Sequence, residues 1–145
     1  MSDGGEPAVL ISNRQSIPVD EEALVVLART TLAGEGVDDR AELTVSFVDD
    51  EEMAGLHVRY LGEPGPTDVL SFPLHEVDDR GVTLLGDVVI APAVAARNHP
   101  GDPSAEVRLL LVHGILHVLG YDHENEGERA EMWARQERYS GVRVP

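Results

Sequence analysis

Four segments of the chain have the spacing of apolar residues that is typical of β-strands. The alternation is clearest where Leu43, Val45 and Phe47 share one face between polar neighbours. The third segment is expected to end at Pro73, because proline cannot donate a hydrogen bond within a sheet. A polar turn at residues 75–81 follows it. The predicted strands are residues 8–12, 42–48, 68–74 and 84–91.

Five other segments have the helical period, and acidic or capping residues begin several of them while glycine or proline ends them. In the longest, Asp102 is the expected N-cap and Pro103 takes the first helical position. An apolar run then continues to Leu119, and Gly120 ends the helix. Apolar residues surround this helix on nearly all sides, which is typical of a helix buried at the centre of a domain. The other predicted helices lie within residues 19–36, 49–61, 91–99 and 127–141.

These elements predict one α+β domain. A chain of 145 residues is long enough for one hydrophobic core and too short for two comfortable ones. No repeat, linker or change of composition divides it. We expect a disordered tail at residues 1–7 and a single domain at residues 8–145, in which strands and helices alternate early and helices dominate late.

The composition limits the chemistry that the domain can perform. Apolar residues make up 42% of the chain but aromatic residues only 4%, so the core must be mainly aliphatic. The chain has no cysteine, which excludes disulfides and thiolate ligands. Any metal ion must therefore be held by histidine, aspartate or glutamate.

The chain also lacks recognisable targeting signals. Its first ten residues have no basic region followed by a long apolar run, so no signal peptide is visible. No apolar stretch is long enough to span a bilayer. We therefore expect a cytoplasmic protein without a membrane partner.

The charge argues against a surface broadly coated with nucleic acid. The formal net charge is −16, and affinity for phosphate backbones comes largely from basic residues. All eleven basic residues are arginine, however, and the planar guanidinium group suits phosphate, so a small cluster could still bind RNA. Arg14, Arg59 and Arg97 come from separate segments, and whether they converge is open at this point.

The segment HGILHVLGYDH, residues 113–123, predicts a metal site. His113 and His117 are four residues apart, so they lie on nearly the same face of the predicted central helix. Gly120 then allows the chain to turn and bring His123 back over them. Three neutral imidazoles with one open position are typical of a catalytic zinc site with a single ion. The remaining histidines are expected to be surface residues without a role: His57, His75 and His99.

The spacing of this segment matches the metzincin protease pattern H-E-x-x-H-x-x-G-x-x-H in its ligands and its glycine. Gly114 stands where the protease has its catalytic glutamate. That glutamate takes a proton from the zinc-bound water of the protease. Its absence argues against ordinary zinc-protease chemistry.

The whole segment resembles instead the signature of the YbeY family, bacterial endoribonucleases of ribosomal RNA maturation. PTDVLSFP at residues 66–73 and LLGDVVI at residues 84–90 resemble two further blocks of that family, and the likeness covers residues 45–133. It implies a small mixed four-stranded sheet packed with about five helices, and one zinc ion held by three histidines on a zincin-like helix. It also implies cleavage of single-stranded rRNA near the 3′ end of 16S rRNA. Structural roles are expected for two polar residues of these blocks, Ser71 in a local hydrogen bond and Asp87 as the cap of a turn.

The chain departs from the family at one position. The family commonly has Y-R-G before the second block, with an arginine thought to act at the active site, and here Leu61 takes that place. Arg59 lies two residues earlier, which on a helix turns the side chain by about 200°. Arg59 is our candidate for contact with a phosphate group. Asp122, next to the third predicted ligand, is our candidate for orienting an imidazole or a water molecule.

Three functions remain open from the sequence. The first is a zinc-dependent endoribonuclease, in which the metal lowers the pKa of water towards about 7 and the attacking group is either water or the 2′-hydroxyl group of the RNA. Its partners would be single-stranded rRNA and the small ribosomal subunit or ribosomal proteins, without DNA. The second is a metal-dependent hydrolase of another substrate, nearest to a metalloprotease. The third is a ribosome assembly factor whose metal is mainly structural.

Overall fold

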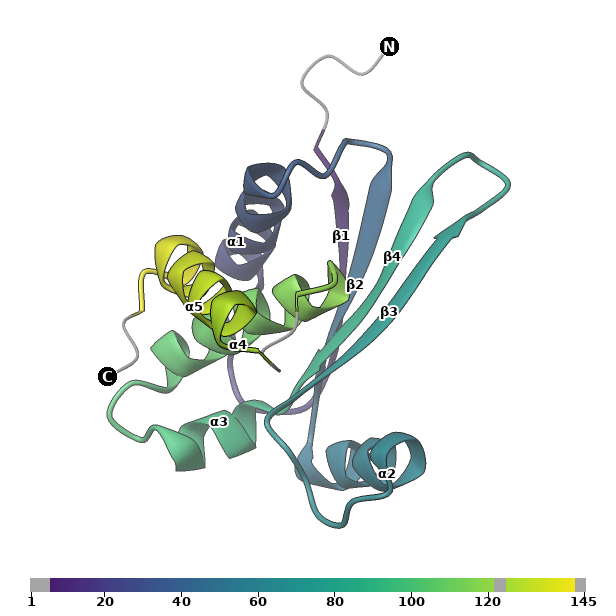
Figure 1. Ribbon diagram of the computed structural model, residues 1–145. Coiled ribbons are helices and arrows are strands. Elements are labelled where there is room, and N and C mark those ends of the chain that lie inside the picture. Colours follow the sequence, from purple (N-terminus) through teal and green to yellow (C-terminus); the bar gives the residue numbers. More distant parts are fainter. Residues whose placement is uncertain (1–5, 122–124, 143–145) are drawn as a thin grey trace.

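The structure is a computed structural model that describes residues 6–121 and 125–142. A twisted sheet forms its centre, with α1, α4 and α5 on one side and α2 alone on the other (Figure 1). The strands are β1 Ala8–Arg14, β2 Ala41–Val48, β3 Val69–Val77 and β4 Thr83–Ile90. The helices are α1 Glu21–Gly34, α2 Asp50–Leu61, α3 Pro92–Asn98, α4 Pro103–Val118 and α5 Glu126–Ser140.

The sheet is mixed, with the strand order β1-β2-β4-β3. β1, β2 and β4 run parallel, whereas β3 pairs antiparallel with β4 at the edge. Parallel neighbours need a long crossover, which α1 supplies between β1 and β2. The predicted α+β class, four-stranded mixed sheet and five helices are confirmed within the described residues.

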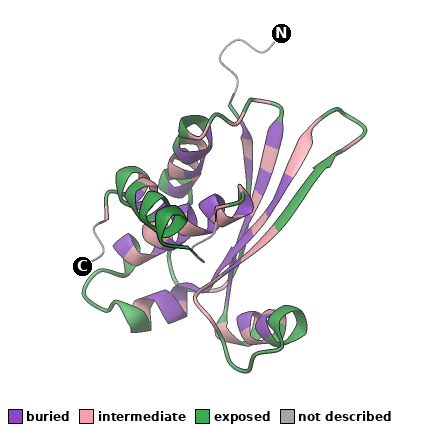
Figure 2. Ribbon diagram, viewed as in Figure 1, coloured by how far each residue is buried: buried purple, intermediate pink, exposed green. Residues whose placement is uncertain are grey.

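The larger core lies between the sheet and helices α1 and α4. The predicted face of β2 is correct, because Leu43, Val45 and Phe47 are all fully buried there. Leu32 of α1 and Leu111 of α4 pack on this face. Figure 2 shows this layer as buried and the tip of the β3–β4 hairpin as exposed. Among the described residues, no helix is both long and apolar enough to cross a membrane.

The two faces of the sheet carry different helices. Leu70 and Val89 pack against Met53 of α2, whereas their strand neighbours Ser71 and Val88 face α4. Successive side chains of a strand point to opposite faces, so α2 lies across the sheet from α4. This matters for any site that would use residues of both helices.

The prediction that the third strand ends at Pro73 is wrong. β3 continues to Val77, and the predicted polar turn therefore begins later than expected. Pro73 is tolerated because β3 is an edge strand, and because the register shifts between Pro73 and Glu76. At this bulge Gly86 has a φ of 142°, and an added Cβ would lie 2.2 Å from the carbonyl oxygen of Phe72. The close approach of the two strands thus requires a glycine.

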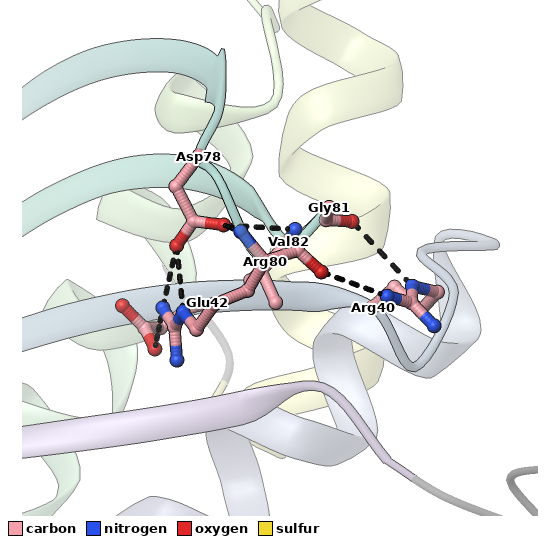
Figure 3. A network of polar contacts seen from close by, with 6 residues as sticks. All are labelled: Arg40, Glu42, Asp78, Arg80, Gly81 and Val82. Carbon is pink, nitrogen blue, oxygen red and sulfur yellow. Dashed lines mark hydrogen bonds and ion pairs between the residues drawn. The ribbon is translucent and has the colours of Figure 1, made fainter.

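The outer end of the hairpin is fastened to β2 by arginines (Figure 3). Arg80 donates to Asp78 at 2.6 Å and approaches Glu42 of β2 at 3.5 Å. Arg40, just before β2, donates to the carbonyl oxygens of Arg80 and Gly81. These contacts give two of the few basic residues a structural role at the end of the sheet.

Glu35, at the C-terminal end of α1, joins three separate parts of the chain. Only 5% of its side chain is exposed, and it accepts hydrogen bonds from Tyr121, Tyr139 and Arg135 at 2.6–2.7 Å. Burial alone would raise the pKa of Glu35, but the bonds from Tyr139, Tyr121 and Arg135 outweigh it and hold that pKa below its ordinary value. Burial and the neighbouring carboxylate raise the pKa of Tyr121 to about 12.

The pKa of Glu35 predicts a pH dependence of stability. Because the pKa is lower in the folded than in the unfolded chain, where it is about 4.3, the folded protein binds this proton less tightly. The ionised Glu35 carboxylate contributes its full stabilisation of the fold above the pKa that it has in the unfolded chain. This stabilisation is lost as the pH falls through the pKa that it has in the folded protein. Urea unfolding from about pH 7 to about pH 3 should show a smaller loss of free energy for Glu35→Gln than for the wild type. Identical pH profiles would contradict this assignment.

Candidate metal centre

Helix α4, which carries the predicted ligands, begins and ends as the sequence predicts. The Asp102 carboxylate accepts from the backbone N–H of Ala105, so it caps the helix. At the other end the N–H of Gly120 bonds to the carbonyl of His117, and the N–H of Tyr121 bonds to that of Leu116. This pair of bonds is a Schellman motif, and Gly120 supplies the left-handed conformation that it needs, with a φ of 103°.

His113 and His117 converge as their spacing predicts. Their Nε2 atoms are 3.1 Å apart, and both side chains are half-buried. Two nitrogens bound to one tetrahedral zinc ion at 2.0–2.1 Å would be about 3.3 Å apart, so the pair fits a shared zinc ion with little movement. Without a cation, only one of the two nitrogens can carry the proton of this contact.

Gln136 of α5 fixes the orientation of the first histidine. Its side-chain oxygen lies 2.7 Å from Nδ1 of His113, and Gln136 is only 3% exposed. An Nδ1–H that donates to this oxygen leaves the lone pair of the histidine on Nε2, which faces His117. Such a partner is what a metal-binding histidine normally has on its other nitrogen. The ring of Trp133 lies beside the same imidazole, with centroids 6.0 Å apart.

Two side chains of the edge strand β3 form hydrogen bonds with backbone carbonyl groups of α4. The Ser71 hydroxyl donates to the carbonyl of Gly114 at 3.1 Å, and Nε2 of His75 lies 2.6 Å from the carbonyl of Val118. The expected local bond of Ser71 is therefore wrong, since its partner is 43 residues away. His75 is exposed as predicted, but it ties β3 to the end of α4.

The other predicted histidines differ in their surroundings. His99 is exposed, as predicted. His57 is buried, so the prediction of a surface residue is wrong there. Its Nδ1 lies 2.9 Å from the carbonyl of Gly65 and its Nε2 lies 3.3 Å from Glu63. His57 thus holds the loop after α2, which no local pattern in the sequence indicates.

The remaining predicted site residues fall into two groups. His123 and Asp122 lie outside the described residues. Among the residues that the structure describes, no group of three or more possible metal ligands converges. Arg59 is exposed in the last turn of α2. It makes no ion pair or hydrogen bond with any residue that the structure describes, and α2 lies across the sheet from α4. The third ligand and both catalytic candidates remain predictions.

The other two arginines considered for RNA contact form ion pairs with acidic residues of α2. Arg14 pairs with Glu52 at 2.6 Å, and Arg97 pairs with Asp50 at 2.8 Å. The three predicted arginines therefore gather around α2, but two of them are neutralised by its first turn. Of this group only Arg59 offers an unpaired charge within the described chain.

Asp87 does not cap a turn as expected, because it lies in the middle of β4. It faces a hollow of about 370 Å³ between α2 and the sheet, which Arg14, Tyr60 and Phe72 also line. Burial raises the pKa of the Asp87 carboxyl. The hollow is on the face opposite Val88 and α4, so it is separate from the histidine pair.

Comparison with known proteins shows the family to which the chain belongs. A family model described as Endoribonuclease YbeY matches residues 10–141. The chain belongs to the YbeY family. The protein called Endoribonuclease YbeY of Thermobifida fusca is 49% identical over 135 residues, which are 87% of each chain. The protein of the same name from Acidothermus cellulolyticus is 46% identical over 141 residues, covering 88% of this chain and 86% of its own.

A solved structure has a similar fold. The solution structure of TM1509 from Thermotoga maritima matches with a TM-score of 0.62 and 28% sequence identity. The match covers 90% of this chain and 87% of that one. The resemblance noted from three short blocks therefore extends over most of the domain.

The three blocks that carry the YbeY resemblance meet at Gly114. An added Cβ there would lie 2.6 Å from Cγ1 of Val88 and 3.2 Å from the Ser71 hydroxyl oxygen. Val88 belongs to LLGDVVI, Ser71 to PTDVLSFP and Gly114 to the histidine segment. A glutamate at position 114, as in the metzincins, would have to enter the sheet. Helix packing therefore explains the glycine that separates this chain from the proteases.

Replacement of Gly114 by alanine should be destabilising. Alanine favours helix by about 1 kcal/mol over glycine, but the clash with Val88 should outweigh this and lower the free energy of unfolding by about 1–3 kcal/mol. Gly55 in α2 is a matched control, because an added Cβ there meets nothing within 4 Å. Gly55→Ala should leave stability unchanged or raise it in the same urea titration. Equal effects of the two substitutions would rule out close packing at Gly114.

Proposed function

We propose that this chain is a metal-dependent, single-strand-specific endoribonuclease. It matures rRNA in the cytoplasm, at the 3′ end of 16S rRNA, and takes part in ribosome quality control. The observation that carries the proposal is the histidine pair, with two Nε2 atoms 3.1 Å apart on the helix that bears the YbeY signature. The names of the relatives, Endoribonuclease YbeY, agree with this activity.

The proposed metal is one zinc ion held by His113, His117 and His123. The absence of cysteine and the two convergent imidazoles favour an all-histidine set. When bound, zinc supplies Lewis acidity toward the phosphodiester and toward the attacking hydroxyl group.

The chain's own residues have separate tasks in this proposal. Gln136 keeps the proton of His113 on Nδ1, so that Nε2 faces His117. Arg59 offers a positive charge that no acid competes for within the described residues, but α2 lies across the sheet from α4, so in this proposal it contacts the RNA backbone away from the histidine pair. Asp122 orients an imidazole or a water molecule next to the third ligand. No residue need replace the metzincin glutamate if the attacking group is the RNA's own 2′-hydroxyl group or a water molecule activated by the metal.

The two modes of attack leave different products. Attack by the 2′-hydroxyl group displaces the 5′ oxygen of the next nucleotide and leaves a 2′,3′-cyclic phosphate. Attack by water leaves a linear phosphate. Analysis of the product ends therefore decides between them.

Charge indicates how the substrate is delivered. At a net charge of −16, and with Arg14 and Arg97 paired to α2, the chain has little general affinity for RNA. We infer that rRNA is presented by the small ribosomal subunit or by ribosomal proteins, which supply the missing positive charge.

Two alternatives are weaker. A metalloprotease-like hydrolase would need a base, and position 114 is packed against Val88, where a longer side chain has no room. A ribosome assembly factor with a structural metal would still sediment with small subunits after loss of His113. With such a factor, precursor rRNA would accumulate only because the subunit is assembled incorrectly.

The role of Gln136 can be tested by metal binding. Gln136→Leu should weaken zinc affinity by about 10–100-fold, because His113 loses the acceptor that orients it. Gln136→Glu retains an acceptor oxygen and should bind zinc nearly as well as the wild type. Both affinities are measured by competition with a chromophoric chelator. If Gln136→Leu bound zinc as tightly as the wild type, this orienting role would be excluded.

The enzyme proposal is tested by removing one ligand. His117→Ala should lose zinc, measured by elemental analysis, and should no longer cleave single-stranded RNA. His99→Ala is the control, because His99 is an exposed histidine at the end of α3. Casein incubated with the wild-type protein should stay intact. Cleavage by His117→Ala at the wild-type rate would indicate a contaminating nuclease or a different active site, and would sink the proposal.

A further inference from the structure

An aromatic ring beside the histidine pair has no task in the proposed reaction. Trp133 belongs to α5, and its ring centroid lies 6.0 Å from that of His113, which in turn lies 4.6 Å from that of His117. The planes of the indole and of the His113 imidazole are 38° apart, so the imidazole does not lie flat on the indole. The indole therefore belongs to the immediate surroundings of the two histidines.

Trp133 is more exposed than its neighbours in α5. Met132 is fully buried and Gln136 is 3% exposed, so these two lie on the face of α5 that packs on the domain, whereas Trp133 is 42% exposed. Among the residues that the structure describes in α5, it is the only large apolar side chain that is exposed. A tryptophan can bury a large apolar area, and much of that area is left here for a ligand to cover.

Exposed aromatic rings are rare in this chain. It has one tryptophan, three tyrosines and two phenylalanines, all within the part that the structure describes, and only Tyr60 and Trp133 are exposed. Tyr60 lies in α2, across the sheet from α4, where its ring meets the ring of Phe72 edge-on at 5.1 Å. Trp133 alone combines an exposed aromatic ring with a place at the histidine pair.

The chemistry of an exposed indole at this place suits an unpaired nucleobase. Every base has a π face that stacks on an aromatic ring, whatever its sequence. Successive bases are about 3.4 Å apart, so the 6.0 Å between the two rings is less than two base steps. Stacking needs no positive charge, and the net charge is −16 while Arg14 and Arg97 are paired with α2. In a duplex the bases cover one another, so this contact favours single strands.

We propose that Trp133 is a substrate-binding residue whose indole stacks on one unpaired base of the RNA. The stacked base holds the neighbouring phosphodiester at His113 and His117 without reading the sequence. The contact accounts for a preference for single strands, because a paired and stacked base has no free face to offer. The inference rests on the proposed function, whose substrate preference it assigns to one side chain.

Two substitutions separate stacking from apolar packing. Trp133→Leu keeps an apolar side chain without a π face, and Trp133→Phe keeps a smaller ring. Trp133→Leu should raise KM for single-stranded RNA by about tenfold or more and change kcat by less than about twofold, because the contact is the same in bound substrate and transition state. Trp133→Phe should stay within about threefold of the wild-type KM. Zinc affinity, measured by chelator competition, should be unchanged in both variants.

The indole also reports the contact directly. Trp133 is the only tryptophan of the chain, so tryptophan emission comes from this ring alone. Mixing the zinc-loaded wild type with single-stranded RNA should quench that emission, which a stopped-flow instrument records before cleavage proceeds. The same sequence presented as a duplex should leave the emission unchanged. This measurement needs no variant, so it decides even where Trp133→Leu does not fold.

The outcomes separate this inference from the proposed function. Cleavage of single-stranded RNA by the wild type without quenching, or with equal KM values for Trp133→Leu and the wild type, would overturn the role of Trp133 alone. Weaker zinc binding by both variants, with KM unchanged at saturating zinc, would make the indole a support of the metal site and also overturn it. Quenching by single-stranded RNA without cleavage would overturn the proposed enzyme and leave the stacking site standing.

Discussion

The close approach of α4 to strands β3 and β4 determines how the rest of the structure is built. Gly114 allows it, because any side chain there would meet Val88 and Ser71. With the helix this near the sheet, its apolar residues pack into the main core, and β3 can reach its carbonyl groups. The histidines then have a fixed place relative to the sheet. A buried helix without a polar face has no amphipathic pattern to orient it. Specific contacts of this kind are therefore needed to fix its rotation about its own axis.

That rotation turns His113 toward α5 and places His117 beside it. The second helix brings a single buried amide, Gln136, to the nitrogen that faces away from the pair. The amide oxygen favours the tautomer with its proton on Nδ1, which leaves the Nε2 lone pair of His113 facing His117. Pre-organisation of this kind requires a rigid scaffold. The α1–α4–α5 packing, with Glu35 at its centre, supplies one.

Much of this could be predicted from local patterns. The strand face of Leu43, Val45 and Phe47, the cap at Asp102 and the convergence of His113 with His117 each depend on residues close in sequence. The strand end predicted at Pro73 is wrong because only the sheet order shows that β3 is an edge strand. Gln136 and Glu35 could not be assigned, since their partners are 23 and 86–104 residues away and no periodicity links them.

These long separations bear on how the protein is made. Glu35 is synthesised 86, 100 and 104 residues before its partners Tyr121, Arg135 and Tyr139. Contacts between distant residues form late, because the loop between them must be closed first. A chain that ends before α5 therefore lacks both the amide that contacts His113 and two of the three donors that hold Glu35.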